Sequence, residues 1–300
     1  MSKSQKPRKI KLTARGIDKY DLYLRSVQEP EAEIEFFERA FKDTFKRRAM
    51  VLREDFCAAA AVCCEWVRTH KERTAVGVDL DPVPLEWGKK YNVSKLKDSE
   101  KERVKFLQTD VRDILPDKAD IIAAENFSFF IFKTRDELRA YFKAACDNLA
   151  KEGLLVTDMM GGPDCMKEKT QDVRKIKIEK GATPGIAPSK GVTTNGLPFH
   201  ARGSFKYVWE QASFDPITHD GVYHIHFRFK DGSQIKKAFT YHWRLWTIPE
   251  IRELMLEAGF KRADVYWEGV DKHGEGDGIY KKQEKAPSEA VFIAYIVGVK

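Results

Sequence analysis

The chain has few of the residues that mark secreted, membrane-spanning or zinc-binding proteins. Its 300 residues include only five cysteines, an odd number with no CxxC pair. This pattern indicates a reducing compartment rather than a disulfide framework or a zinc site. No apolar run approaches the roughly 18 residues of a membrane span, and the N-terminal residues lack the apolar segment of a signal peptide. We therefore expect a cytoplasmic protein with no membrane partner.

Acidic residues are absent from the N-terminal end of the chain. The formal net charge is +7, but residues 1–15 hold six Lys or Arg and no acid, so the remainder carries only 7 − 6 = +1. We interpret residues 1–16 as a basic, disordered tail and residues 17–300 as one folded domain. A nuclear-import or RNA-contacting arm is the alternative for the tail. It is not favoured, because basic motifs this short are weak evidence.

Glycine is missing from the turn where a nucleotide-binding domain most needs it. Residues 54–61 read EDFCAAAA, between a β-rich run, MVLRED, and an amphipathic stretch, VCCEWVRTH. A dinucleotide site requires glycines because backbone N–H groups must close on a pyrophosphate. The alanines therefore disfavour NAD and FAD, but they are compatible with S-adenosylmethionine, which has no phosphate. We expect Ala58 to have a negative φ, in a turn displaced slightly to accommodate its Cβ.

Short β-rich runs alternate with helical patterns from about residue 49 to residue 160. The β-rich runs are MVLRED, TAVGVDL, VKFLQTD, DIIAAEN and GLLVTDMM. One intervening helix is predicted to begin at Pro82 after Asp81, and another at a capping box formed by Thr134 and Glu137. This alternation predicts an α/β fold with a mostly parallel, Rossmann-like sheet covered on both faces.

The pattern changes after residue 160. Residues 161–204 are rich in Lys, Gly and Pro and show little periodicity, which predicts a long lid loop. Three strand-like runs separated by turn signals then predict an antiparallel β-meander: FKYVWEQASF, GVYHIHFRF and SQIKKAFTYHWRLW. We interpret residues 161–246 as an insertion that covers the substrate pocket. A last helix, opened by Thr247 and Glu250, precedes two more β-rich runs.

Acidic residues end two of the predicted parallel strands. Asp79 follows Ala58 by 79 − 58 = 21 positions, where its carboxylate can accept hydrogen bonds from two ribose hydroxyls, and Leu80 offers an apolar face to an adenine. Asp110 ends the next strand and can accept from the adenine amine, with the Val111 N–H directed at a ring nitrogen. Either acid alone could simply cap the following helix. Together, beside the alanine turn, they favour cofactor binding.

These segments resemble the class I S-adenosylmethionine-dependent methyltransferases, and more narrowly methyltransferase-domain proteins whose first motif reads like REDFCGT. The resemblance covers roughly residues 17–300 and includes LREDFCAAAAVCCEWV, TAVGVDLDP, NFSFFIFKTRDELRAYF and FTYHWRLWTIPEIRELMLEAGF. It implies a seven-stranded sheet, mostly parallel with an antiparallel last strand, and S-adenosylmethionine as the cofactor. The family usually has glycine where Ala58 stands, and often where Ala60 stands.

The resemblance also implies a set of cofactor-binding residues: Glu54, Cys57, Ala58, Asp79, Asp110 and Val111. Asn126 and Phe127 extend the predicted site, because ENFSFF ends the fourth strand at the edge where open α/β sheets place reacting groups. Tyr20 and Tyr23, at helical spacing, are predicted to close over the cofactor. The alternative is that these two tyrosines only dock the N-terminal helix.

Aromatic residues are concentrated in the predicted meander, where we place acceptor specificity. The candidates are Tyr207, Trp209, Tyr241, Trp243 and Trp246, with Arg244 as a carboxylate clamp. Aromatic faces can hold a cationic or planar acceptor. Because side chains alternate along a strand, we expect about half of these residues to be ordinary core.

His224 and His226 are the strongest candidate metal ligands. Their i, i+2 spacing places both on one face of a strand, where Glu210 or His242 could supply a third ligand. This spacing is also common on half-buried strands without a metal. We therefore predict no metal site.

The residues together predict in-line displacement at the sulfonium methyl by a nucleophile of a small-molecule acceptor. A small molecule is favoured because the insertion is compact and no separate recognition domain follows. An RNA or protein acceptor is the second interpretation, supported by the basic tail and the lysines of residues 166–190. The third is a degenerate cofactor-fold binding protein without activity, suggested by the missing glycines.

Overall fold

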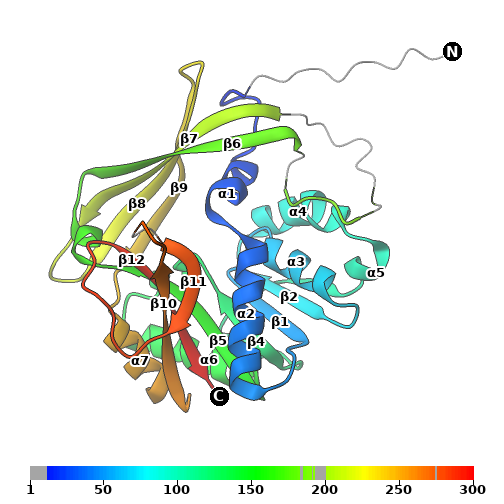
Figure 1. Cartoon of the computed structure of the whole chain (residues 1–300), viewed down its shortest axis with the longest axis vertical. Coiled ribbons are helices and arrows are strands. Elements are labelled where there is room, and N and C mark those ends of the chain that lie inside the picture. Colours follow the sequence, from blue (N-terminus) through cyan, green and yellow to red (C-terminus); the bar gives the residue numbers. More distant parts are fainter. Residues whose placement is uncertain (1–11, 183–184, 191, 193–200, 274–275) are drawn as a thin grey trace.

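Two β-sheets and the helices around them form the structure (Figure 1). This computed structural model describes residues 12–182, 185–190, 192, 201–273 and 276–300. The strands of the larger sheet are β1 (Val51–Asp55), β2 (Thr74–Asp79), β3 (Val104–Gln108), β4 (Ala119–Ala124), β5 (Leu149–Gly161), β10 (Arg262–Val270), β11 (Gly276–Lys282) and β12 (Phe292–Val299). Most of the predicted tail, residues 1–11, lies outside the described residues.

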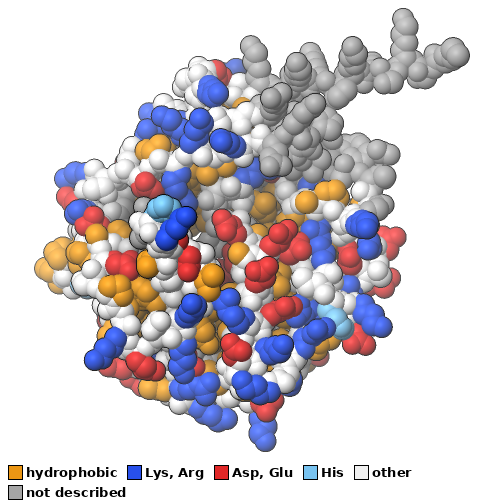
Figure 2. Space-filling model, viewed as in Figure 1, with side chains coloured by type: hydrophobic (Ala, Val, Ile, Leu, Met, Phe, Trp, Pro, Cys, Tyr) orange, Lys and Arg blue, Asp and Glu red, His pale blue; other side chains and the backbone are white. Residues whose placement is uncertain are grey.

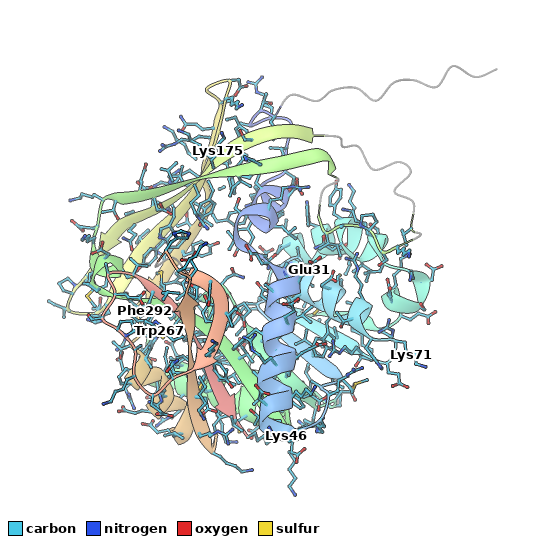
Figure 3. All side chains as sticks on the ribbon, viewed as in Figure 1. Glu31, Lys46, Lys71, Lys175, Trp267 and Phe292 are labelled. Atoms are coloured by element: carbon cyan, nitrogen blue, oxygen red, sulfur yellow. The ribbon has the colours of Figure 1, made fainter. Side chains whose placement is uncertain are left out.

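The larger sheet has the strand order β11-β10-β12-β5-β4-β1-β2-β3. Strands β1 to β5 pair in parallel, whereas β12 is antiparallel to both β5 and β10. The predicted mostly parallel sheet with an antiparallel last strand is therefore confirmed. The edge strand β11 is an eighth strand that the sequence pattern did not reveal. At the same end of the sheet, Trp267 of β10 packs against Phe292 of β12, with ring centroids 4.5 Å apart (Figure 3).

Helices cover both faces of this sheet. They are α1 (Lys19–Val27), α2 (Pro30–Phe45), α3 (Ala61–Thr69), α4 (Pro82–Tyr91), α5 (Asp98–Lys101), α6 (Arg135–Asn148) and α7 (Ile248–Glu257), with short 3₁₀ turns η1 (Val93–Lys95), η2 (Ser128–Ile131) and η3 (Pro163–Met166). The predicted capping boxes begin α6 and α7, and Asp81 caps α4. The core under α2 and α3 includes Phe37 and Trp66, and the core under α6 and α7 includes Phe142 and Leu254. Within the described part of the chain, no helix is long and apolar enough to cross a membrane.

The smaller sheet is antiparallel and has four strands in the order β6 (Thr170–Ala182), β7 (Ala201–Phe214), β8 (Asp220–Phe229) and β9 (Gln234–Arg244). Strands β7 to β9 confirm the predicted meander. The predicted lid loop over residues 161–204 is wrong where β6 lies, since this strand pairs with β7 from Thr170 to Ala182. As an edge strand with an exposed face, β6 can be rich in lysine and still be regular. Residues 183–184, 191 and 193–200 of that prediction lie outside the described residues.

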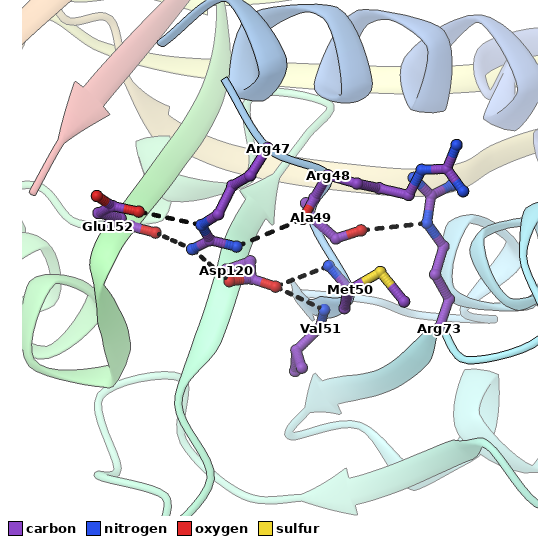
Figure 4. Close-up of polar contacts among 8 residues, drawn as sticks. All are labelled: Arg47, Arg48, Ala49, Met50, Val51, Arg73, Asp120 and Glu152. Atoms are coloured by element: carbon purple, nitrogen blue, oxygen red, sulfur yellow. Dashed lines mark hydrogen bonds and ion pairs between the residues drawn. The ribbon is translucent and has the colours of Figure 1, made fainter. Parts of the chain in front are cut away.

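A carboxylate at the amino end of β4 fixes the start of β1. Asp120 Oδ2 accepts hydrogen bonds from the backbone N–H groups of Met50 (2.7 Å) and Val51 (3.1 Å), and its Oδ1 accepts from the Arg47 guanidinium at 2.9 Å (Figure 4). Arg47 also donates to Glu152 Oε2 at 3.0 Å. These contacts hold β1 between β4 and β2, so that its carboxyl end faces α3.

Asp120→Ala should lower the free energy of unfolding by ~2–4 kcal/mol. The change leaves two backbone N–H groups and Arg47 without their acceptor, and each unsatisfied group costs about 1–3 kcal/mol. Urea unfolding would measure the loss. Glu152→Ala is the control, because this acid is more than half exposed and its ion pair should contribute less than ~1 kcal/mol. Equal losses in the two variants would contradict the structural role of Asp120.

Candidate active site

The turn between β1 and α3 has the backbone conformation that glycines would adopt. Phe56 (φ 56°), Ala58 (φ 44°) and Ala60 (φ 50°) all lie in the left-handed region. The prediction of a negative φ at Ala58 is therefore wrong. Left-handed geometry costs a residue with a side chain roughly 1–2 kcal/mol. The turn must therefore be held by its surroundings.

Backbone hydrogen bonds hold this turn from two sides. The Cys57 N–H donates to the Val78 carbonyl of β2 at 3.1 Å, and the Ala60 N–H donates to the Cys57 carbonyl at 2.6 Å. From α4, the Asn92 amide donates to the Ala59 carbonyl at 2.8 Å. Burial raises the pKa of the Cys57 thiol well above its ordinary value, so this cysteine is a packed turn residue and not a nucleophile.

Two glycines outside the turn provide the room that it needs. A Cβ at Gly77 of β2 would lie 2.8 Å from Cys57 Sγ. A Cβ at Gly88 of α4 would collide with the Ala59 carbonyl oxygen. The backbone of the turn can therefore still lie close to its neighbours. The glycines that permit this lie on β2 and α4 and not in the turn itself.

Asp79 connects the turn to the end of β2. Its Oδ2 accepts from the Ala58 N–H at 2.8 Å and its Oδ1 accepts from the Asp81 N–H at 2.9 Å. Burial raises the pKa of this half-buried carboxyl, and the two N–H groups oppose that shift. Burial raises the pKa of the Tyr20 hydroxyl, and the charges of Asp81, Asp18 and Asp79 add to the shift. The structure therefore joins Ala58 to Asp79 directly and brings Tyr20 within electrostatic reach of Asp79.

Helix α1 bridges the two sheets over this position. Tyr20 contacts Trp87 of α4 and Phe239 of β9, with ring centroids 5.9 and 5.8 Å apart, and Tyr23 contacts Phe239 at 4.9 Å. The two tyrosines therefore dock the helix, which was the alternative interpretation. Tyr20 also contacts α4, the helix that follows Asp79, so docking and covering the site are compatible.

Asp110 is already paired. Its carboxylate accepts from the Arg112 N–H at 2.8 Å and from Arg112 Nη2 at 2.7 Å, and this hydrogen bonding lowers its pKa. An adenine amine would have to share this acceptor with the guanidinium, which the sequence analysis did not anticipate. The Val111 side chain is buried, and its carbonyl accepts from Arg53 at 2.5 Å. Leu80 is 63% exposed and remains available as an apolar face.

Four carboxyl groups lie on the α2 side of the larger sheet, towards its carboxyl edge. Glu54 lies on β1, Glu125 directly follows β4, and Asp158 lies on β5, at the carboxyl ends of three adjacent strands. Each stands two residues after an apolar residue of the core under α2, and so projects from that face of the sheet. These apolar residues are Leu52, Ala123 and Val156. Glu33 is buried in the first turns of α2, close to the Glu31 labelled in Figure 3.

Burial and mutual repulsion favour the protonated form of these acids. Burial raises the pKa of Glu33 to about 8, and the charges of Glu54 and Asp158 add to the shift. Burial also raises the pKa of Glu54 to about 7 and that of Asp158 to about 7. The pKa of Glu125 is well above its ordinary value for the same reason, with Asp158 as the next cause. The four groups therefore lie within electrostatic reach of one another.

Two oxygens of this cluster have no hydrogen-bond partner among the described residues, namely Glu33 Oε2 and Glu125 Oε1. Glu33, Glu125 and Asp158 were not predicted from the sequence. A signal was present for two of them, because Glu125 and Asp158 end β-rich runs in the same way as Asp79. The position of Glu33 could not be inferred, since it depends on how α2 crosses the sheet (Figure 1).

The loop after β4 joins this acid cluster to the smaller sheet. Asn126 and Phe127 have φ values of 59° and 57°, and the Phe127 N–H donates to Asp158 Oδ1 at 2.8 Å. The Phe127 ring meets Trp243 of β9 edge to face, with centroids 6.1 Å apart. Both predicted residues therefore lie where the two sheets meet.

The predicted acceptor-binding aromatics divide into core and inner-surface residues. Tyr207, Trp243 and Trp246 are buried. Trp209 and Tyr241 are half-buried, and Tyr241 stacks on Trp243 with centroids 4.3 Å apart. Tyr207 and Trp209 stand two residues apart on β7, and Tyr241 and Trp243 two residues apart on β9, so each pair shares one face. The difference in burial therefore runs along that face and is not the expected alternation, and it leaves Trp209 and Tyr241 as the residues available to a ligand.

Arg244 is not positioned as a carboxylate clamp. Its guanidinium donates to the Lys133 carbonyl at 3.0 Å and to Glu250 Oε1 at 3.2 Å, and it lies 3.9 Å above the Trp246 ring. Arg244 therefore attaches β9 to α7, and the prediction is corrected. The sequence alone does not reveal this role of Arg244. Because side chains alternate along a strand, Arg244 points away from the face that Trp243 occupies.

The two candidate metal ligands on β8 have other partners. His226 Nε2 lies 2.8 Å from Glu210 Oε2, and His224 Nδ1 lies 2.9 Å from Thr240 Oγ1. Both histidines belong to the outer face of the smaller sheet. The described portion of the chain contains no group of three or more His, Cys, Asp or Glu placed to hold a metal ion.

The strand order and the site at its carboxyl edge define the fold as that of the class I S-adenosylmethionine-dependent methyltransferases. Among solved structures, the chain is similar to the CcbJ methyltransferase from Streptomyces caelestis, with 14% identity, coverage of 95% of this chain and 97% of that one, and a TM-score of 0.61. It is also similar to CalS10, an amino pentose methyltransferase from Micromonospora echinaspora, with 14% identity, coverage of 91% of this chain and 94% of that one, and a TM-score of 0.59. A third similar structure is the sugar N-methyltransferase KedS8 from Streptoalloteichus, with 15% identity, coverage of 100% of this chain and 98% of that one, and a TM-score of 0.58. No protein-family model and no curated protein matches the sequence.

Ala58→Gly should leave the free energy of unfolding unchanged or raise it by up to ~1 kcal/mol. Glycine relieves the left-handed strain of roughly 1–2 kcal/mol. The greater flexibility of the unfolded chain offsets about 0.4–1 kcal/mol of this gain in the free energy of unfolding. The matched control is Ala59→Gly in the same turn, where φ is not positive, and it should destabilise. Urea unfolding of both variants measures the difference. Equal destabilisation would mean that Ala58 is unstrained.

Glu33→Gln should stabilise the ligand-free protein more at pH 8 than at pH 5. With a pKa raised from 4.5 to about 8, the folded protein binds more protons than the unfolded chain across this window. The contribution of Glu33 to the free energy of unfolding therefore falls as pH rises through the window. We expect a gain of at least ~1 kcal/mol at pH 8 from thermal unfolding. Glu35→Gln, on the exposed side of α2, is the control, and a gain that does not depend on pH would contradict the burial of Glu33.

Proposed function

We propose that this chain is an S-adenosylmethionine-dependent methyltransferase that acts on a small-molecule acceptor by in-line displacement. The observation that carries the proposal is the Asp79 carboxylate, bound to the Ala58 N–H at the carboxyl edge of a methyltransferase sheet. The similar structures include CalS10, with S-adenosylmethionine bound, and KedS8, and both are described as acting on sugars. These likenesses support a compact acceptor.

The residues at the turn fit this cofactor. Asp79 uses one lone pair of each oxygen for a backbone N–H, which leaves lone pairs for two ribose hydroxyls. Leu80 would contact the adenine, and Asp110 with Arg112 would lie at its edge. Glu54 and the turn would hold the methionine end. When bound, S-adenosylmethionine supplies an electrophilic methyl group on a positively charged sulfur, and that charge suits the acid cluster.

The residues around the turn would position the acceptor and exclude water. Helix α1 holds Tyr20 against Phe239 of β9, so the smaller sheet would close the cofactor edge. Phe127 and Tyr241 would flank an acceptor approaching from that sheet. Orientation and desolvation are large parts of the rate enhancement in such a displacement.

Charge separates the two faces of the smaller sheet. Its outer face carries a groove of about 950 Å³ lined by basic residues: Lys175, Lys206, Arg228, Lys230, Lys236 and Lys237. Figure 2 shows Lys and Arg side chains gathered over β6 and β7, where Figure 3 labels Lys175. The groove gives RNA a place to dock. The groove includes Glu210 and His226, which alternate with Trp209 and Ile225 and so lie on the face of the sheet opposite the aromatic residues. RNA docked there would lie away from the proposed acceptor position, so a small acceptor is favoured.

Asp79→Asn should weaken S-adenosylmethionine binding at least ~tenfold, because charged hydrogen bonds contribute roughly 1.5–3 kcal/mol each. Asparagine is preferred to alanine because its oxygen can still accept from the Ala58 N–H. Asp81→Asn is the matched control, since this exposed carboxylate only caps α4. Calorimetry on the two folded variants decides the assignment. An unchanged dissociation constant for Asp79→Asn would exclude this residue as the ribose ligand.

A further inference from the structure

Hydrogen bonds within the described part of the fold do not use all the carboxyl oxygens of the acid cluster formed by Glu33, Glu54, Glu125 and Asp158. Buried carboxylates are normally paired with a cation or saturated with hydrogen bonds. Glu33 and Glu125 are each only 8% exposed, yet one oxygen of each has no partner within the described residues. The cluster is also a source of repulsion. Its geometry therefore points to a positively charged ligand that completes it.

Aromatic rings form one wall of this cluster. Tyr295 of β12 lies opposite Asp158 in the β5–β12 ladder and stacks on Phe36 of α2, with centroids 4.2 Å apart. Tyr280 of β11 meets Tyr295 edge to face at 4.7 Å. The fields of Glu125 and Asp158 reach both tyrosines, adding to the effect of burial on their pKa. Carboxylates beside aromatic rings are a combination that binds ammonium groups.

We propose that the acceptor is an amine, bound as its ammonium cation by Glu33, Glu125 and Asp158 against the rings of Tyr280 and Tyr295. This inference rests on the proposed methyltransferase function and names its substrate class. Glu54 is left to the cofactor, because it lies on β1 and accepts from the Cys63 N–H at 2.8 Å, directly behind the turn. The other three acids remain for an acceptor at the ends of β4 and β5.

The unpartnered oxygen of Glu125 has a second role in this arrangement. An ammonium cannot act as a nucleophile until it loses a proton. Transfer of that proton to Glu125 Oε1 breaks an N–H bond and forms an O–H bond, and the electron pair stays on the nitrogen. The charges of Asp158, Glu33 and Glu54 raise the pKa of this carboxyl group beyond the effect of burial and so favour its protonated form, and its own field reaches Tyr280 and Tyr295.

The test compares benzylamine with benzyl alcohol, which have similar size and shape but differ in charge at pH 8. Calorimetry is carried out on the full chain in the presence of S-adenosylhomocysteine, whose own binding is measured first. The wild type should bind benzylamine at least ~tenfold more tightly than benzyl alcohol, as expected for a charge-assisted contact. Glu125→Gln and Glu33→Gln should each reduce this preference at least ~threefold while leaving S-adenosylhomocysteine affinity within about twofold.

Glu35→Gln on the exposed side of α2 is the control and should keep the full preference. Equal binding of the two probes by the wild type overturns the amine proposal. A preference that survives in both Glu125→Gln and Glu33→Gln also overturns it, because the cation would then bind elsewhere. Failure to bind S-adenosylhomocysteine, with the amine preference intact, would instead refute the methyltransferase function and leave the amine site standing.

Discussion

Close backbone approach at the β1–α3 turn is the constraint on which the candidate site depends. The turn is left-handed at three residues that have side chains, and each such residue costs roughly 1–2 kcal/mol. Gly77 and Gly88 make this geometry possible, since a Cβ at either position would collide with the turn. Asp79 and Asn92 then hold it through hydrogen bonds to the backbone. The conformation of a glycine-rich loop is thus maintained by packing instead of by glycine itself.

Asp79 links this constraint to ligand binding. The same carboxylate accepts from the turn and is proposed to accept from a ribose, so the position of the turn and the position of the ligand are set by one group. A ligand that binds Asp79 is therefore held at a fixed distance from Ala58. The proposed site would therefore tolerate alanines in place of glycines, because its ligand requires no phosphate cradle.

Much of the fold could be predicted because its signals are local. Strand-to-helix alternation, the Thr134 and Thr247 capping boxes and the acid at the end of β2 are all short-range patterns. The φ of Ala58 was predicted wrongly because it depends on Gly88, which is 30 residues further along the chain. Strand β6 was missed because its lysines lie on an exposed face. The acid cluster could not be predicted without the topology, because its carboxyl groups come from α2, β1, the residue after β4, and β5.

The distribution of charge connects stability to the proposed chemistry. The buried acids lower the stability of the ligand-free protein as they ionise, because their pKa values are raised to about 7 or 8. A cation that binds only the folded protein reverses this loss and stabilises it in proportion to its affinity. Glu33 and Glu125 thus work against folding and in favour of a cationic ligand. Residues that oppose folding in this way are expected mainly where a ligand completes the structure.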